Sequence, residues 1–108
     1  MSTAPKSQVM KLAELAAYQD GSVVSRQITK EEAGNVTLFA FDEGQELSEH
    51  RAPYDALVYV LDGKIEVHIA GKAFTLSTGD AIIMPANEPH SLKALKRFKM
   101  LLTMIRSG

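Results

Sequence analysis

The sequence contains no cysteine, and neither sign of charge is in excess. Without cysteine, disulfide bonds, thiolate metal sites and cysteine nucleophiles are excluded. The 12 Lys and Arg residues nearly balance the 13 Asp and Glu residues, so the net charge is −1. A protein that binds nucleic acid or an anionic membrane through its charge would carry a clear positive excess. We therefore expect no nucleic-acid partner and no membrane partner.

Long hydrophobic runs are also missing. The chain starts with MSTAPKSQVM, which lacks the apolar core of a secretion signal, and no later run approaches the length of a membrane span. On these grounds we expect a cytoplasmic protein. The 108 residues are enough for one domain and too few for two.

The first third of the chain is expected to differ from the rest. Residues 1–7 are small and polar and predict a flexible tail. Residues 8–35 predict an N-terminal extension followed by the first strands, and residues 36–108 predict the main barrel. Within the extension, apolar residues recur at helical spacing and predict a short helix, with an edge strand over Val9–Met10 as the alternative.

After the extension, the pattern alternates between strand and turn up to the end of the chain. Short runs of β-branched or alternating apolar residues are separated by turn residues such as the pair Asp62–Gly63. This pattern is typical of an all-β sandwich or barrel. The predicted strands cover residues 22–29, 36–41, 56–61, 65–70, 73–77, 81–85, 91–95 and 97–105.

The last predicted strand is apolar on both faces. Met100 and Leu102 lie on one face, and Leu101 and Ile105 lie on the other. A barrel wall needs only one apolar face, so the second face predicts contact with another layer. We favour a second copy of the chain, packed as a homodimer across which the N-terminal extension could exchange, because a small domain gains much from extra buried area. Burial between two sheets of one chain is the alternative.

Two segments carry a recognisable pattern. GQELSEHRAPYDALVYVLDG places His50 between Gly44 and Gly63, and GDAIIMPANEPHSLKA places Pro85 and His90 at fixed offsets from its first glycine. These spacings resemble the two motifs of the cupin superfamily, and the resemblance covers about residues 36–105. It implies an all-β fold, a double-stranded β-helix (jelly-roll) barrel.

The resemblance also implies which residues would hold a metal. Cupins typically bind one divalent metal through three histidines and a glutamate. His50 and His90 match two of these positions, whereas Ala52 stands at another histidine and Ala56 at the glutamate. Two imidazoles alone bind a metal weakly. The resemblance therefore implies either one weakly held transition metal (Zn, Ni, Fe or Cu) or no cofactor.

Other side chains could complete the ligand set. Asp55 or Glu46 are candidates, together with waters or a carboxylate ligand. If Ala56 faces the barrel, period-2 alternation turns Asp55 away, unless the preceding turn breaks the alternation. His68 lies on a strand whose inward face the sequence leaves open, and we favour an ordinary exposed histidine there.

Three uses of the histidine pair remain open: a weak metal site, a metal-free acid–base pair, or hydrogen-bonding groups in a pocket. We favour a barrel that binds a small molecule in its interior at the reduced His50/His90 site, with metal optional. The alternative is a metal-dependent enzyme, a dioxygenase or isomerase, with both histidines and a third ligand. The alanine substitutions would also widen the pocket, which we expect to be lined by Ala52, Ala56, Val58 and Met84.

Overall fold

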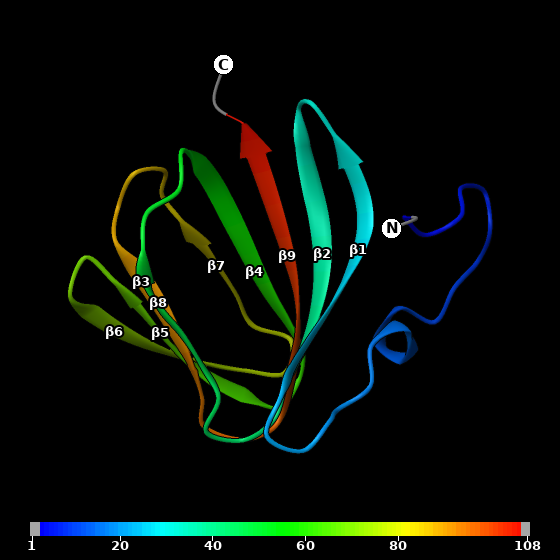
Figure 1. Cartoon of the computed structure of the whole chain (residues 1–108). Coiled ribbons are helices and arrows are strands. Elements are labelled where there is room, and N and C mark those ends of the chain that lie inside the picture. The colour runs from blue at the N-terminus through cyan, green and yellow to red at the C-terminus, as the bar shows by residue number, and fades with distance from the viewer. Residues whose placement is uncertain (1–2, 107–108) are drawn as a thin grey trace.

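Two antiparallel sheets face each other in the computed structural model, which describes residues 3–106 (Figure 1). One sheet has five strands in the order β1-β2-β9-β4-β7, and the other has four in the order β3-β8-β5-β6. The predicted all-β barrel is thus confirmed. The elements described are the 3-10 helix η1 (Leu12–Leu15) and the strands β1 (Val23–Glu31), β2 (Gly34–Phe41), β3 (Glu46–His50), β4 (Tyr54–Asp62), β5 (Lys64–Ile69), β6 (Lys72–Ser77), β7 (Ala81–Met84), β8 (His90–Ala94) and β9 (Phe98–Arg106).

The main hydrophobic core lies between the two sheets, because each strand turns alternate side chains inward. On β4, Val58 and Val60 are fully buried, whereas Leu57 and Tyr59 on the opposite face are 38% and 39% exposed. This alternation agrees with the sequence-based prediction for β4. On β9 the inward side chains include Phe98, which stacks on a second buried phenylalanine with ring centroids 4.4 Å apart.

The two sheets converge at one end of the barrel and diverge at the other (Figure 1). At the converging end, β4 turns into β5 at Gly63, whose φ is +92°. A Cβ at this position would stand 1.9 Å from the carbonyl oxygen of Arg97, so the turn needs glycine for space as well as for conformation. The diverging end carries the β1–β2 turn, the start of β4 and the end of β9.

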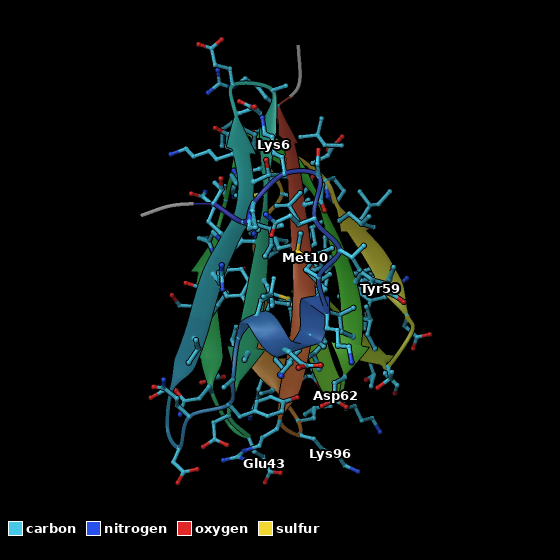
Figure 2. All side chains as sticks on the ribbon, turned by 90° about the vertical axis from the view of Figure 1, so that its right-hand side faces the viewer. Lys6, Met10, Glu43, Tyr59, Asp62 and Lys96 are labelled. Carbon is cyan, nitrogen blue, oxygen red and sulfur yellow. The ribbon has the colours of Figure 1, made fainter. Side chains whose placement is uncertain are left out.

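The N-terminal extension covers the outer face of the five-stranded sheet (Figure 2). Ala16 and its neighbours pack on Leu38, Ala40 and Leu101. Among the hydrogen bonds that hold the extension in place are those from Lys99 Nζ to the Ala13 carbonyl (2.6 Å) and from the Tyr18 hydroxyl to Asp62 (2.6 Å). At Leu101, the second layer predicted for the last strand is therefore the extension of the same chain. The homodimer stays a prediction.

The N-terminal segment differs in detail from the expectation. Residues 1 and 2 of the predicted flexible tail lie outside the described residues, and Ala4 is held in place, because it is 7% exposed and its N–H donates to the Ile28 carbonyl (2.9 Å). The predicted helix is a single 3-10 turn that ends where Ala16 adopts an extended backbone and packs on the sheet. The alternative strand over Val9–Met10 is not formed. Within residues 3–106, no helix has the length or hydrophobicity to cross a membrane.

One strand, β3, was not among the predicted strands. Its sequence, ELSEH, contains a single apolar side chain, Leu47, and the other residues are polar and exposed. The period-2 signal is therefore absent. The strand forms because its backbone pairs with β8, which sets Glu46 opposite Lys93 and His50 opposite His90.

Candidate functional site

The pairing of β3 with β8 brings the two motif histidines together. His50 and His90 are cross-strand partners, and their Nε2 atoms lie 3.1 Å apart. The ring centroids are 4.3 Å apart, with the ring planes inclined at 70°. His90 shares the inward face of β8 with Leu92, which is 3% exposed, so the pair faces the barrel interior. It lies towards the diverging end, because His50 closes β3 shortly before β4 begins there.

Backbone carbonyl groups fix the orientation and the tautomer of both rings. His50 Nδ1 lies 2.8 Å from the Ser48 carbonyl oxygen, and His90 Nδ1 lies 3.2 Å from that of Glu88. A carbonyl oxygen only accepts hydrogen bonds, so each Nδ1 carries the proton and donates it. In the neutral rings, both Nε2 atoms therefore present a lone pair, and these two lone pairs face each other.

The two rings differ in their contact with water. His90 is 5% exposed, whereas His50 is an exposed residue. Burial lowers the pKa of His90 below its usual value, and the neighbouring His50 ring lowers it further, although the Glu88 carbonyl acts in the opposite direction. His90 is thus neutral near pH 7 and keeps the Nε2 lone pair free to accept a proton or a metal ion.

The separation of the two nitrogens fits a pair of metal ligands. Two nitrogens 3.1 Å apart, each at a usual zinc–nitrogen distance of about 2.0–2.1 Å, would subtend about 100° at the metal. This angle lies between the octahedral and tetrahedral values. Among the described residues there is no group of three His, Cys, Asp or Glu side chains that could hold a metal ion. Two protein ligands are thus what this part of the chain offers.

The other residues considered as ligands lie elsewhere. Asp55 is exposed, and its Oδ1 accepts a hydrogen bond from the Ala86 N–H (2.9 Å). Glu46 stands opposite Lys93 on the outer face of the four-stranded sheet. His68 also lies on this outer face, but it is half-buried and its Nε2 lies 2.7 Å from Glu66, whereas the sequence favoured an exposed histidine.

The four residues expected to line a pocket are mostly part of the core. Ala56 and Met84 are 2% exposed and Val58 is fully buried. Ala56 pairs with Met84 on one side and with Met104 on the other. Ala52 is half-buried, and its carbonyl accepts a hydrogen bond from the Asn87 N–H (2.8 Å). A ligand would meet Ala52 first and would reach the other three only if core side chains moved, so the widened pocket stays a prediction.

A hollow at the diverging end was missed in the sequence analysis. Tyr54 and Arg106 are cross-strand partners, and the Arg106 guanidinium lies 6.0 Å from the centre of the Tyr54 ring. They line the hollow together with Asn35 and charged residues of the β1–β2 hairpin. The sequence does not reveal this hollow, because Tyr54 and Arg106 are far apart in the chain. They become neighbours only through the pairing of β4 with β9.

The second motif forms the turn that precedes His90. Asn87, in this turn, has a φ of +67°, a left-handed conformation that asparagine adopts more readily than most residues with a side chain. The family model described as cupin domain matches residues 37–105 of the chain. The chain is a cupin. The resemblance of its two motifs to this family is thereby confirmed.

Several solved structures and one curated protein are similar to this cupin. A conserved protein of unknown function from Streptococcus pyogenes is 31% identical, with a TM-score of 0.91 over 100% of this chain and 97% of that one. A cupin 2 conserved barrel domain protein from Leptotrichia buccalis is 38% identical, with a TM-score of 0.87 over 90% of this chain and 47% of that one. A Streptomyces cyaneus protein named polyketide synthase CurC is 31% identical over 62 residues, which are 56% of this chain and 40% of that protein. The chain thus spans less than half the length of the curated relative.

Proposed function

We propose that this cupin binds a small polar molecule in its barrel through His50 and His90, with one divalent transition metal as an optional partner. The observation that carries the proposal is the 3.1 Å approach of two Nε2 atoms whose rings both donate through Nδ1 to carbonyl oxygens. Two lone pairs in this position repel each other unless a cation or a hydrogen-bond donor lies beside them. This arrangement therefore favours the binding of a cation or a hydrogen-bond donor beside the two Nε2 atoms.

His50 and His90 would hold the metal through Nε2. A bound divalent metal would supply a Lewis acid that polarises an oxygen of the ligand. The carbonyl groups of Ser48 and Glu88 keep both rings oriented, as the outer hydrogen bonds of metal-binding histidines usually do. Because His50 is exposed and His90 is not, exchange with solvent would take place on the His50 side.

Proton transfer without a metal is the second candidate. The same two nitrogens can share one proton, and the lowered pKa of His90 keeps this ring neutral and able to accept it. A metal-dependent dioxygenase or isomerase with a third protein ligand has less support, since the described residues contain no group of three such ligands.

Nuclear magnetic resonance of the histidine rings tests the proposal directly, because the chain has only three histidines. On titration with Zn²⁺, the ring signals of His50 and His90 are expected to shift together. The ring of His68, on the outer face, is expected to stay unchanged and serves as the internal control. The response should be lost in His50→Ala and in His90→Ala and kept in His68→Ala.

The same signals report on ligands without metal. A screen of small acids, sugars and carbonyl compounds would reveal a molecule that hydrogen-bonds to the two rings. If neither metal ions nor any compound shifted the signals of His50 and His90, or if His68 responded equally, the proposed site would be rejected.

A further inference from the structure

We propose that the hollow at the diverging end of the barrel is a separate binding site, which takes the carboxylate or phosphate group of a small organic molecule at Arg106. This site goes beyond the function proposed for the histidine pair and does not depend on it. Three features support it: the contact between Arg106 and Tyr54, the other polar groups that line the hollow, and the balance of charge around it.

Tyr54 and Arg106 are set side by side by the pairing of β4 with β9. Two residues further into these strands, Ala56 pairs with Met104, and Ala56 is 2% exposed in the main core. Side chains two residues apart on a strand point to the same face, so Tyr54 and Arg106 lie on the barrel-facing side of the five-stranded sheet. The Arg106 N–H donates to the Ala33 carbonyl (2.9 Å), which fixes the end of β9 beside the β1–β2 turn.

The Tyr54 ring holds the Arg106 guanidinium in a cation–π contact. The guanidinium carbon lies 6.0 Å from the centre of the ring. A guanidinium that rests on an aromatic face keeps the N–H groups along its edge free, and this planar fork matches the paired oxygens of a carboxylate or a phosphate. Within residues 3–106, no ion pair joins Arg106 to a carboxylate. Its donors can therefore serve a ligand.

Other polar groups line the same hollow, which has a volume of about 430 Å³. Lys30 and Asn35 are cross-strand partners, and Asn35 pairs in turn with Met104, so they reach the hollow from the same face of the sheet as Arg106. The ammonium and the amide both add hydrogen-bond donors. The volume lies within the range of sites for small organic molecules, so the ligand is expected to be larger than a simple inorganic ion.

The charges around the hollow are mixed, with a small positive excess. Lys30 and Arg106 line it together with the carboxylates of Glu31 and Glu32. Glu31 Oε1 lies 3.9 Å from Nζ of Lys6, which offsets part of its charge. Three cations thus stand against two carboxylates, which favours an anionic ligand over a cationic one. Because salt screens the attraction between exposed charges, we expect binding to weaken as the ionic strength rises.

Titration of the full chain with benzoate, phenyl phosphate and benzamide, followed by nuclear magnetic resonance, tests the proposal. Benzamide has nearly the size and shape of benzoate but no charge. The chain has three tyrosines, so the ring signals of Tyr54 report on the hollow, and those of Tyr18 and Tyr59 are internal controls. We expect benzoate or phenyl phosphate to shift the Tyr54 signals and benzamide to leave them unchanged. The anion with the lower Kd shows whether the site prefers a carboxylate or a phosphate.

Variants identify the group that holds the anion. Arg106→Gln should raise the Kd about tenfold or more, the usual effect of losing a hydrogen bond to a charged group. Arg106→Lys should raise it less, because the charge remains and only the planar fork is lost. Glu32→Gln should lower the Kd, because it removes a carboxylate from the hollow. Lys93→Gln makes the same change of net charge on the outer face of the four-stranded sheet and should leave the Kd unchanged.

The outcomes separate this site from the histidine pair. Equal responses to benzamide and to the two anions, no response to either anion, or an Arg106→Gln variant that binds like the parent chain would each contradict the proposal. His50→Ala and His90→Ala should keep the Tyr54 response. If the anions shifted the ring signals of His50 and His90 and left those of Tyr54 unchanged, the hollow would be rejected as a site, and the histidine pair would be supported instead.

Discussion

At the scale of single residues, Asp42 ties the N-terminal extension to the barrel. Its carboxylate accepts hydrogen bonds from the Gly21 N–H (2.6 Å) and from Arg97 Nε (2.7 Å). Arg97 also forms an ion pair with Asp20 in the extension. The hydrogen bond from Arg97, followed by that from Gly21, lowers the pKa of Asp42 to about 2. The charged form of Asp42 is thus the form that the folded chain favours.

We expect Asp42→Asn to destabilise the fold at neutral pH and to lose this effect in acid. Because the folded-state pKa of about 2 lies below the ordinary value of 3.8, the stabilisation is fully present above pH 3.8 and disappears as the pH falls through about 2. Urea denaturation of both proteins across this range measures the difference. Glu43→Gln, which neutralises the exposed neighbouring carboxylate, is the control. A constant difference between Asp42→Asn and the parent protein at every pH would refute the role assigned to the charge.

The histidine pair shows how far sequence alone can predict a site. The resemblance of the two motifs to the cupin pattern implied that His50 and His90 would meet, although the strand β3 that carries His50 was not predicted. It did not predict that both Nε2 atoms would face each other, since that depends on the carbonyl groups of Ser48 and Glu88. Those groups become partners only after the backbone of β3 and the Asn87 turn have formed.

At the scale of secondary-structure elements, the β4–β5 turn connects the two sheets and lies close to the backbone that precedes β9. Gly63 has a positive φ and also lies against the backbone of Arg97. Gly71, in the β5–β6 turn, has a similar φ of +83°, but a Cβ there would meet no atom within 4 Å. The two glycines therefore separate the effect of backbone conformation from the effect of close approach.

We expect Gly71→Ala to lower the free energy of unfolding by about 1–2 kcal/mol, the usual strain of a left-handed residue with a Cβ. Gly63→Ala should lower it by several kcal/mol more, because the new Cβ clashes with backbone and not with a flexible side chain. Chemical denaturation of both variants measures the two values. Equal losses would mean that the β8–β9 turn moves aside and that the close approach is not required.

Alternating burial marks some of the strands that were predicted correctly. β4 and β5 show this alternation in their sequences and were assigned from it. β3 has no such pattern and forms by pairing with β8, which lies about 40 residues further along the chain. The last strand was expected to meet another layer, and the extension was expected to exchange across a dimer. That the extension itself covers Leu38 and Leu101 could not be assigned, because helical spacing alone does not say which surface an apolar face covers.

At the scale of the whole molecule, the extension leaves part of the outer face uncovered. Leu57, Tyr59, Ile83 and Ile105, here called the outer patch, are 38–62% exposed on β4, β7 and β9. Leu57 pairs with Ile83, so the residues lie together, and Figure 2 shows Tyr59 on the same side of the barrel as the extension. The four side chains are uncharged, and the exposed Asp55, which pairs with Ile105, borders them. An apolar surface of this kind can meet an identical surface across a two-fold axis, which suits a second copy of this chain.

We expect the chain to form a homodimer of twice its mass of 11.8 kDa, with the outer patch at the interface. Leu57→Lys combined with Ile83→Lys should yield monomers, because a two-fold axis would set the new charges close to one another in an apolar surface. Light scattering coupled to size-exclusion chromatography measures the mass.

Thr75→Lys, on an exposed position of the four-stranded sheet, is the matched control and should leave the dimer intact. Since the substituted side chains are already exposed in a single chain, circular dichroism should show that the monomeric variant remains folded. A parent chain that is monomeric at every concentration, or a double variant that remains dimeric, would rule out the outer patch as the interface.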